Sequence, residues 1–283
     1  MTRILVIGKS GQVARALAKT MPEGLNARFA SRKTVDLAKP ATIALAIDQF
    51  EPEAVIIAAA YTAVDAAETD SVTAWQVNSF APGEIGRIGA SRGFPVIHIS
   101  TDYVFDGRGD MPFAETDACG PINVYGASKL AGELALANSG AQSVILRTSW
   151  VYDDCGQNFL TTMRKLRDRP SLDIVADQFG RPTHADEIAR SIWKILPTIR
   201  TTDLAGVFHL TGGGPFTTWH EFAAHIFGGN GPQLNPVSTD QFPRPARRPA
   251  NSRLNTEKLQ SQLSISMADW RETLAKIIYR LER

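Results

Sequence analysis

Tyr125 and Lys129 lie four residues apart, and their types and spacing suit proton transfer to a carbonyl group. They fall in a helix-compatible run, so both side chains would project from one helical face. A phenol with a pKa near about 10 is a poor acid at neutral pH, and a nearby ammonium lowers that pKa by stabilising the phenolate. The pair predicts a general acid that protonates a carbonyl oxygen as hydride reaches its carbon. Tyr-x-x-x-Lys alone is also compatible with an ordinary helix surface.

Thr101 and Asp102 follow an apolar run, residues 94–99, that predicts a buried parallel strand. They would therefore lie at the carboxyl end of that strand, where open α/β sheets bind ligands. The Thr101 hydroxyl can hydrogen-bond the same substrate oxygen as Tyr125, and Lys129 can also hold a cofactor ribose. We interpret Thr101, Tyr125 and Lys129 as the catalytic set.

A glycine-rich turn follows the first expected strand, residues 3–8, and leads into a helical pattern. Such a turn lets backbone N–H groups and the helix dipole meet a pyrophosphate. Ala14 stands where a third glycine is usual, which weakens the match but still permits close packing of helix on strand. The cofactor-binding residues expected in this turn are Gly8, Ser10, Gly11, Gln12 and Val13.

The second expected strand, residues 27–30, ends beside Arg32. A site specific for NAD usually places a carboxylate at this point to bind the ribose 2′-hydroxyl. Arg32 suits a 2′-phosphate instead, so we expect NADPH as cofactor, with NADH as a second cofactor that the residues do not repel. Arg32 is equally compatible with a solvated loop charge. Asp36 and Leu37, expected at the end of a short third strand, would edge the adenine.

Further apolar runs alternate with helical patterns. Residues 54–60 and 143–147 predict buried strands, the second being the sixth central strand, and residues 72–92 predict one long helix that Pro82 bends or splits. The alternation predicts an α/β fold with a doubly wound parallel Rossmann sheet. Small residues at the end of the 54–60 run and just after it would let the backbone approach a flat cofactor; they are Ala59, Ala60 and Thr62.

The composition changes after residue 150. We expect residues 1–150 to form the dinucleotide-binding Rossmann domain and residues 151–283 to form mainly a smaller C-terminal substrate-binding domain. Within the second part, residues 171–196 are expected to return to the first domain through a strand near its start and a helix near its end. A short strand is also expected at residues 207–210.

The whole-chain composition describes an ordinary globular protein, with a net charge of +1, 43% hydrophobic and 21% charged residues. This charge gives no reason to expect nucleic acid as a partner. No apolar run reaches membrane-spanning length, and the first residues lead directly into a strand instead of a signal peptide. Cys119 and Cys155 are too few for a disulfide framework, so reduced thiols and a cytoplasmic location are expected.

Several motifs, taken in order, resemble those of the dTDP-4-dehydrorhamnose reductases, which are extended short-chain dehydrogenase/reductases. The resemblance covers nearly the whole chain and rests on residues 8–13, 58–65, 100–107, 125–129, 147–152, 177–180 and 247–252. It implies NADPH-dependent reduction of the 4-keto group of a nucleotide-linked deoxysugar, above all dTDP-4-dehydrorhamnose to dTDP-rhamnose. Such a product serves cell-surface polysaccharide synthesis.

The resemblance also implies residue roles. Tyr125 would be the acid and would also contact the cofactor. Lys129 would lower the pKa of Tyr125 and bind the cofactor ribose, and the Thr101 hydroxyl would orient the carbonyl. The residues implied for substrate binding are Thr101, Asp102, Trp150, Arg181 and Arg247. The two arginines would bind the diphosphate, because guanidinium binds phosphate in a bidentate way. Trp150 is equally compatible with a core position, and the arginines with solvated surface positions.

Some members of that family bind Mg²⁺ at a dimer interface through a glutamate, and here Asp186 occupies that position with Glu187 beside it. The shorter side chain leads us to predict no metal, and a homodimer is left open. Two other functions also remain open. One is an NDP-sugar epimerase or dehydratase, which keeps its nicotinamide bound. The other is a non-catalytic NADP-binding regulatory subunit, like that of methionine adenosyltransferase.

Overall fold

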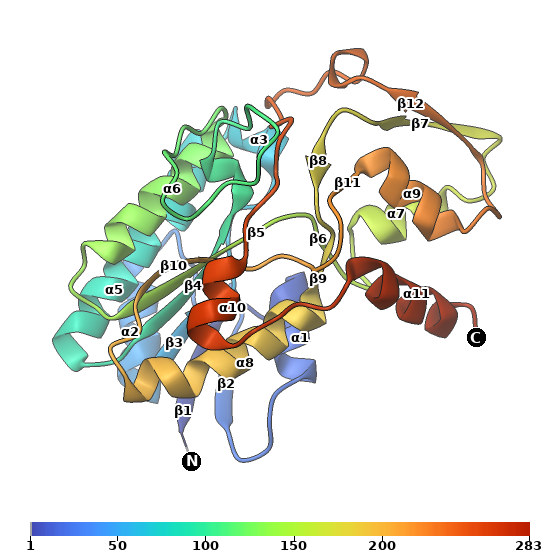
Figure 1. Cartoon of the computed structure of the whole chain (residues 1–283). Coiled ribbons are helices and arrows are strands. Elements are labelled where there is room, and N and C mark those ends of the chain that lie inside the picture. Colours follow the sequence, from blue (N-terminus) through green and yellow to red (C-terminus); the bar gives the residue numbers. More distant parts are fainter. Residues whose placement is uncertain (1) are drawn as a thin grey trace.

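The computed structural model describes residues 2–283, and its centre is a six-stranded sheet in the order β10-β5-β4-β3-β1-β2 (Figure 1). All neighbouring strands in this sheet are parallel. The strands are β1 (Arg3–Ile7), β2 (Asn26–Ala30), β3 (Ala54–Ile57), β4 (Val96–Thr101), β5 (Ser143–Thr148) and β10 (Gly206–His209). The expected doubly wound parallel α/β sheet is confirmed.

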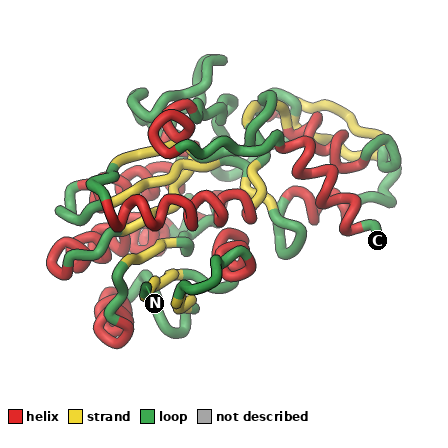
Figure 2. The backbone as a smooth tube through the Cα atoms, turned by 60° about the horizontal axis from the view of Figure 1, so that its bottom comes forward, coloured by secondary structure: helices red, strands yellow, loops and turns green. Residues whose placement is uncertain are grey.

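Helices cover both faces of the sheet, because apolar residues alternate along β1 toward two separate cores (Figure 2). Ile4 and Val6 pack with the helices α1 (Gln12–Lys19) and α8 (Ala185–Thr201). Leu5 and Ile7 belong to the opposite core. That core is covered by α2 (Pro40–Phe50), α5 (Ala81–Arg92) and α6 (Val124–Ala137).

Two expectations about the sheet are wrong. Residues 31–39 form turns and no third strand, because the Thr42 hydroxyl bonds both the backbone N–H and the carbonyl of Asp36 and holds this connection as a loop. The sixth strand of the sheet is β10, which pairs with β5, whereas residues 143–148 are the fifth strand in chain order.

The long helix expected at residues 72–92 is divided. It consists of α4 (Ser71–Trp75), a π-helical turn (Gln76–Phe80) and α5, with the short α3 (Val64–Ala67) before it. Pro82 has no N–H to donate to the carbonyl of Asn78, which explains why the regular pattern breaks just before it. The same carbonyl lies against Gly132 of α6, where a Cβ would come within 1.9 Å. The π turn thus brings Asn78 close to α6.

A second, smaller unit has its own apolar core and lies beside the carboxyl ends of the strands (Figure 1). Its strands are β6 (Val151–Tyr152), β7 (Ser171–Val175), β8 (Phe179–Gly180), β9 (Thr183–His184), β11 (Thr217–Thr218) and β12 (Gln233–Val237). Its helices are α7 (Phe159–Lys165), α9 (Trp219–Phe227) and α11 (Trp270–Leu281), while α10 (Glu257–Leu263) packs near β10. Short 3₁₀ turns span Asp102–Val104 and Thr239–Gln241.

The strand in the expected return of residues 171–196 to the first domain is wrong, whereas the division into two domains stays a prediction. α8 packs against α1 and contributes to the core of the main sheet. β7 pairs instead with β12 in a separate two-stranded sheet. Between residues 2 and 283, no helix is both long and apolar enough to cross a membrane.

Candidate active site

One cavity of about 750 Å³ lies over the carboxyl ends of the strands, where the order of the strands reverses between β1 and β3. Open α/β sheets bind ligands at such a topological switch point. The cavity brings together most of the predicted site residues, which are Gly8, Ser10, Gly11, Gln12, Val13, Arg32, Asp36, Leu37, Ala59, Ala60, Thr62, Thr101, Asp102, Tyr125, Lys129 and Trp150.

The glycine turn has the geometry of a cradle for a flat or anionic group. Gly8 has φ +131°, and a Cβ there would lie 3.1 Å from the carbonyl carbon of Ala58. Gly11 precedes α1, and within residues 2–283 no side chain caps the first N–H groups of that helix. Those N–H groups and the helix dipole remain available to a phosphate. The turn therefore fits the pyrophosphate of a dinucleotide.

Arg32 lies at the mouth of the same cavity. Its side chain is 78% exposed, and its Nε lies 3.7 Å from Oδ1 of Asp36. An exposed pair at this distance holds the guanidinium only weakly. Arg32 is therefore free to meet an anion near the ribose, and its role in recognising a 2′-phosphate stays a prediction.

Tyr125 and Thr101 are positioned by the first turn of α6 and the end of β4. Asn123 caps α6 by accepting a hydrogen bond of 2.7 Å from the N–H of Gly126. Burial raises the pKa of Tyr125 to about 12; a hydrogen bond from Thr101 opposes that shift, and the charge of Asp102 adds to it. At neutral pH the phenol therefore carries its proton, as an acid must.

Lys129 is directed differently from the sequence-based expectation. Its Nζ donates a hydrogen bond of 2.7 Å to the carbonyl of Ile99 and lies 3.0 Å from Nε2 of His98. Burial lowers the pKa of Lys129 to about 8, and Glu133 opposes that shift. The structure thus differs from the prediction that Lys129 depresses the pKa of Tyr125, because burial raises that pKa instead.

Asp102 is almost fully buried on the wall of the cavity. Burial raises its pKa to about 6, and the neighbouring hydroxyls of Ser252 and Thr101 oppose the shift. Oδ1 accepts a bond of 3.0 Å from the Thr101 hydroxyl, whereas Oδ2 has no partner among the described residues. This second oxygen can accept a hydrogen bond from a ligand hydroxyl.

Sequence reasoning missed the partner of Trp150. The ring of Trp150 stacks on that of Trp219 with centroids 3.8 Å apart and planes 13° apart, and both rings line the cavity. Nε1 of Trp219 donates a bond of 3.2 Å to Oε1 of Gln178. Trp219 is the first residue of α9, and the only local signal is the capping pair Thr218 and Glu221 before and after it. That pair predicts a helix start and nothing about a binding site.

The structure does not bring Arg181 and Arg247 into the cavity. The Arg181 guanidinium lies 3.9 Å from the centroid of the Phe216 ring and donates a bond of 3.1 Å to the carbonyl of Gly212. The Arg247 side chain is exposed, and its carbonyl accepts a bond from Asn123. Their predicted contact with the substrate diphosphate stays a prediction that this geometry does not support.

Asp186 and Glu187, the positions considered for Mg²⁺, already have protein partners. Oδ2 of Asp186 lies 2.8 Å from Nζ of Lys19 and 3.9 Å from the guanidinium of Arg190. Glu187 accepts a hydrogen bond of 2.8 Å from Thr273. A cation at Oδ2 of Asp186 would have to displace the lysine, whereas Oδ1 is buried without a hydrogen-bond partner among the described residues. The absence of a metal stays a prediction.

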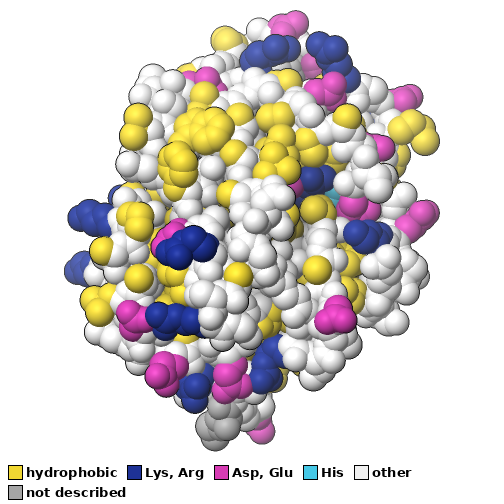
Figure 3. Space-filling model, turned by 90° about the vertical axis from the view of Figure 1, so that its left-hand side faces the viewer, with side chains coloured by type: hydrophobic (Ala, Val, Ile, Leu, Met, Phe, Trp, Pro, Cys, Tyr) yellow, Lys and Arg dark blue, Asp and Glu magenta, His cyan; other side chains and the backbone are white. Residues whose placement is uncertain are grey.

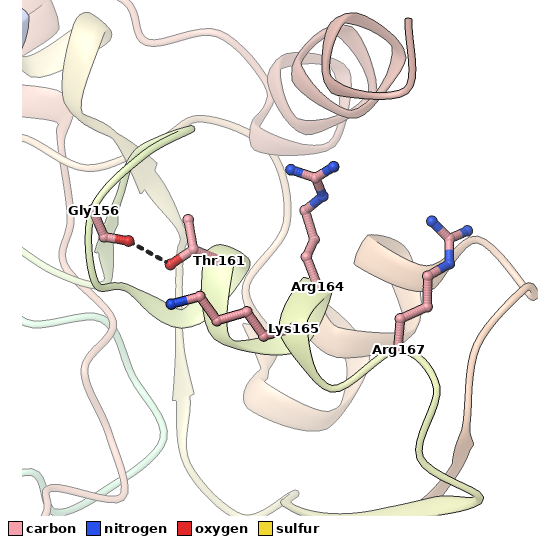
Figure 4. A pocket seen from close by; sticks show the side chains of 5 residues that line it. All are labelled: Gly156, Thr161, Arg164, Lys165 and Arg167. Carbon is pink, nitrogen blue, oxygen red and sulfur yellow. Dashed lines mark hydrogen bonds between the residues drawn. The ribbon is translucent and has the colours of Figure 1, made fainter.

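A second cavity, of about 560 Å³, lies beside α7 and is rich in basic side chains (Figure 4). Arg164 donates a hydrogen bond of 3.2 Å to the carbonyl of Leu281 at the end of α11, and Arg167 lies 3.3 Å from the Glu282 carboxylate. These arginines therefore fix the end of α11 to α7. We assign no ligand to this cavity.

Comparison with known proteins agrees with this geometry. The model of a protein family described as "RmlD substrate binding domain" matches residues 1–283. A relative named dTDP-4-dehydrorhamnose reductase, from Sinorhizobium fredii, is 40% identical over 99% of this chain and 97% of its own length.

Two solved structures have the same fold. One, of a dTDP-4-dehydrorhamnose reductase from Clostridium acetobutylicum, has a TM-score of 0.94 at 32% identity and covers 100% of both chains. The other, of a dTDP-4-dehydrorhamnose reductase from Bacillus anthracis in complex with NADP, has a TM-score of 0.91 at 30% identity. It covers 99% of this chain and 100% of its own.

Proposed function

We infer that this chain, which belongs to the RmlD substrate-binding-domain family, is an oxidoreductase that reduces the 4-keto group of dTDP-4-dehydrorhamnose with NADPH. The observation that carries this conclusion is one cavity that joins an uncapped glycine turn to Thr101 and Tyr125. A cofactor cradle beside a protonated phenol is the arrangement that carbonyl reduction requires. NADPH, when bound, supplies the hydride that reaches the keto carbon.

At the reacting centre, the protein's side chains supply a proton and orient the keto oxygen that receives it. We propose that the Thr101 hydroxyl, which donates to Oδ1 of Asp102 in this structure, turns to donate to the keto oxygen when substrate binds. Tyr125 then donates its phenolic proton to the same oxygen, leaving a phenolate. The high pKa of Tyr125 ensures that this proton is present at neutral pH. The unpartnered Oδ2 of Asp102 would accept a hydrogen bond from a sugar hydroxyl and so fix the sugar ring.

We assign the remaining residues to two walls of the cavity. The first wall, from residues 1–150, would hold the cofactor, with the Gly8–Val13 turn at the pyrophosphate and Arg32 at the 2′-phosphate. The other cofactor contacts proposed are Asp36, Leu37, Ala59, Ala60, Thr62 and Lys129. The second wall, mainly from residues 151–283 together with Trp150, would hold the nucleotide sugar.

The test is NADPH oxidation by purified protein, measured with a panel of dTDP-, UDP- and GDP-linked 4-ketosugars. We expect oxidation only when a ketosugar is present, fastest turnover with dTDP-4-dehydrorhamnose, and a rhamnosyl product. A protein that converts the sugar without consuming NADPH would instead be an epimerase or dehydratase. A protein that binds NADPH and turns over no ketosugar would be a regulatory subunit.

We propose in addition a homodimer in the cytoplasm. Large apolar side chains are exposed on α4, the π turn and α6, with Val72 68%, Phe80 65% and Leu134 55% exposed. Figure 3 shows one face of the molecule on which hydrophobic side chains reach the surface. Burial of these side chains would favour association of two copies. Free thiols at Cys119 and Cys155 accord with a reducing compartment. Light scattering of the parent and of Phe80→Glu tests the dimer, and a monomeric parent refutes it. Cell fractionation tests the location.

A further inference from the structure

The ammonium of Lys129 is buried and needs hydrogen-bond acceptors. The nearest carboxylate on α6, that of Glu133, is occupied by the Arg147 guanidinium at 2.7, 3.0 and 3.2 Å. The acceptors that Lys129 does contact both belong to β4, namely the carbonyl of Ile99 and Nε2 of His98. A lysine ammonium has three donors, and two of them are thus directed at this strand.

His98 is itself fully buried and faces α6 from the middle of β4. Burial and the neighbouring Lys129 hold the pKa of His98 well below its ordinary value, so the ring is neutral. A neutral imidazole that accepts from Lys129 through Nε2 carries its hydrogen on Nδ1. Nδ1 has no hydrogen-bond partner among the described residues. The ring is therefore used on the side that faces Lys129.

We propose that His98 is a positioning residue of the active site, which holds the Lys129 ammonium against β4 so that its third donor points into the cofactor cavity. This inference rests on the proposed function, because it concerns how Lys129 is presented to the cofactor ribose. His98 itself does not line the cavity, whereas Lys129 does. Its effect is therefore exerted through Lys129.

The contact between His98 and Lys129 bears on the pH dependence of cofactor binding. An acceptor stabilises the ammonium, so loss of the acceptor favours the neutral amine and lowers the pKa of Lys129 further. If the charged form binds the cofactor, affinity is present below that pKa and is lost as the pH rises through it. On α6 and the elements packed against it, the other titratable groups are Tyr125 and Glu133 on α6, Arg147 on β5, Asp102 and Tyr103 after β4, Asp65 on α3, and Glu84, Arg87 and Arg92 on α5. Of these, Glu133 shifts the pKa of Lys129.

The test compares His98→Leu, which removes the acceptor, with His98→Gln, whose amide oxygen reaches the position of Nε2. The matched control is His209→Leu on β10, because His209 is also fully buried in the same sheet and bonds Asn255 instead of Lys129. The dissociation constant of NADPH is measured by tryptophan fluorescence from about pH 6 to pH 10, and thermal unfolding is recorded alongside. These readouts require no turnover, so an inactive parent would refute the proposed function without affecting this comparison.

We expect the parent to lose NADPH affinity as the pH rises through about 8. His98→Leu should move that midpoint down by about one pH unit, which corresponds to about 1.4 kcal/mol, while His98→Gln and His209→Leu should keep the parental midpoint. If His98→Leu fails to fold, the pH dependence of acetic anhydride labelling at Lys129 is compared between the parent and His98→Phe. Parental midpoints in all variants, or a parental labelling profile in His98→Phe, would overturn the proposal.

Discussion

The two walls of the cavity are built in different ways. The cofactor wall consists of short contiguous segments that follow β1, β3 and β4, such as the turn at Gly8. The opposite wall joins residues that are far apart in the chain, where Trp150 stacks on Trp219 and Trp219 bonds Gln178. The first wall is fixed by local backbone geometry, whereas the second exists only once the smaller unit has folded.

The same contrast is visible in the backbone. Gly8 on the first wall and Trp150 on the second both have positive φ values, +131° and +47°. Glycine adopts such values without steric cost, but for a tryptophan the left-handed region costs roughly 1–2 kcal/mol. The packing of Trp150 between Trp219 and Gly180 offsets this cost. The strained backbone of the second wall is therefore maintained by tertiary contacts. We expect a substitution on one wall to affect the ligand at that wall and to leave binding at the other wall unchanged.

The largest effect is expected at the junction of the walls. Tyr125→Phe removes the acid hydroxyl and keeps the ring, so turnover should fall by about 10²–10⁴-fold. Folding and NADPH affinity should stay close to those of the parent, because neither wall is altered. Steady-state kinetics and fluorescence titration measure the two quantities. Turnover within a factor of two of the parent would remove Tyr125 from the mechanism.

A change confined to the cofactor wall should affect NADPH alone. Gly8→Val places a branched side chain at φ +131° and against the Ala58 backbone, where even a Cβ lies at 3.1 Å. Strain of this kind costs about 1–3 kcal/mol, so NADPH affinity should fall roughly tenfold or more. The matched control is Gly24→Val, because Gly24 also has positive φ and has nothing within 4 Å of its Cβ position. Equal NADPH affinities in both variants would contradict the assignment of this turn.

The corresponding substitution on the second wall is Trp219→Ala, which should affect sugar binding alone. Trp219→Ala removes the ring that stacks on Trp150, and an aromatic pair of this kind contributes about 0.5–1.5 kcal/mol. The KM for the nucleotide sugar should rise roughly twofold to tenfold, while the dissociation constant of NADPH should not change. Trp219→Phe keeps an aromatic ring and should recover most of the loss. If the dissociation constant of NADPH rose by the same factor as the KM for the nucleotide sugar, the two walls would not act independently.

The smallest effect is expected at the exposed edge of the cofactor wall. Arg32→Ala should reduce the preference for NADPH over NADH by about twofold to fivefold, because exposed charge pairs contribute only about 0.2–1 kcal/mol. Lys33→Ala, at an exposed neighbour outside the cavity, serves as control and should keep the parental ratio. A parental ratio of kcat/KM values in Arg32→Ala would leave Arg32 as a solvated loop charge.

The contrast between the walls also explains how much the sequence could predict. The runs that became β1, β3, β4 and β5 are apolar and β-branched, so their strands and the motifs after them were predictable from local patterns. The segment of β7 has a similar local pattern, and only its pairing with β12 separates it from the main sheet. Periodicity describes which side of a strand is buried and carries no information about its neighbour.

The missed site residues share the same cause. The sequence pattern predicts His98 as part of a buried strand, and its contact with Lys129 spans 31 positions of the chain. Trp219 reaches Trp150 only because α9 packs behind the cavity. Arg181 was chosen for its charge, but Phe216 and Gly212 hold its guanidinium outside the cavity. In each case, packing between segments that are distant in the chain determines where the side chain lies.

The most direct test of the proposed reaction is to trace the hydride from NADPH into the sugar product. NADPH carrying deuterium at the transferred position of the nicotinamide is incubated with dTDP-4-dehydrorhamnose and the protein, and the sugar product is examined by NMR. We expect dTDP-rhamnose with deuterium bound to C4 and one NADPH consumed for each sugar reduced. A rearranged sugar without deuterium, or a sugar left unchanged while NADPH stays reduced, would contradict the proposed reaction.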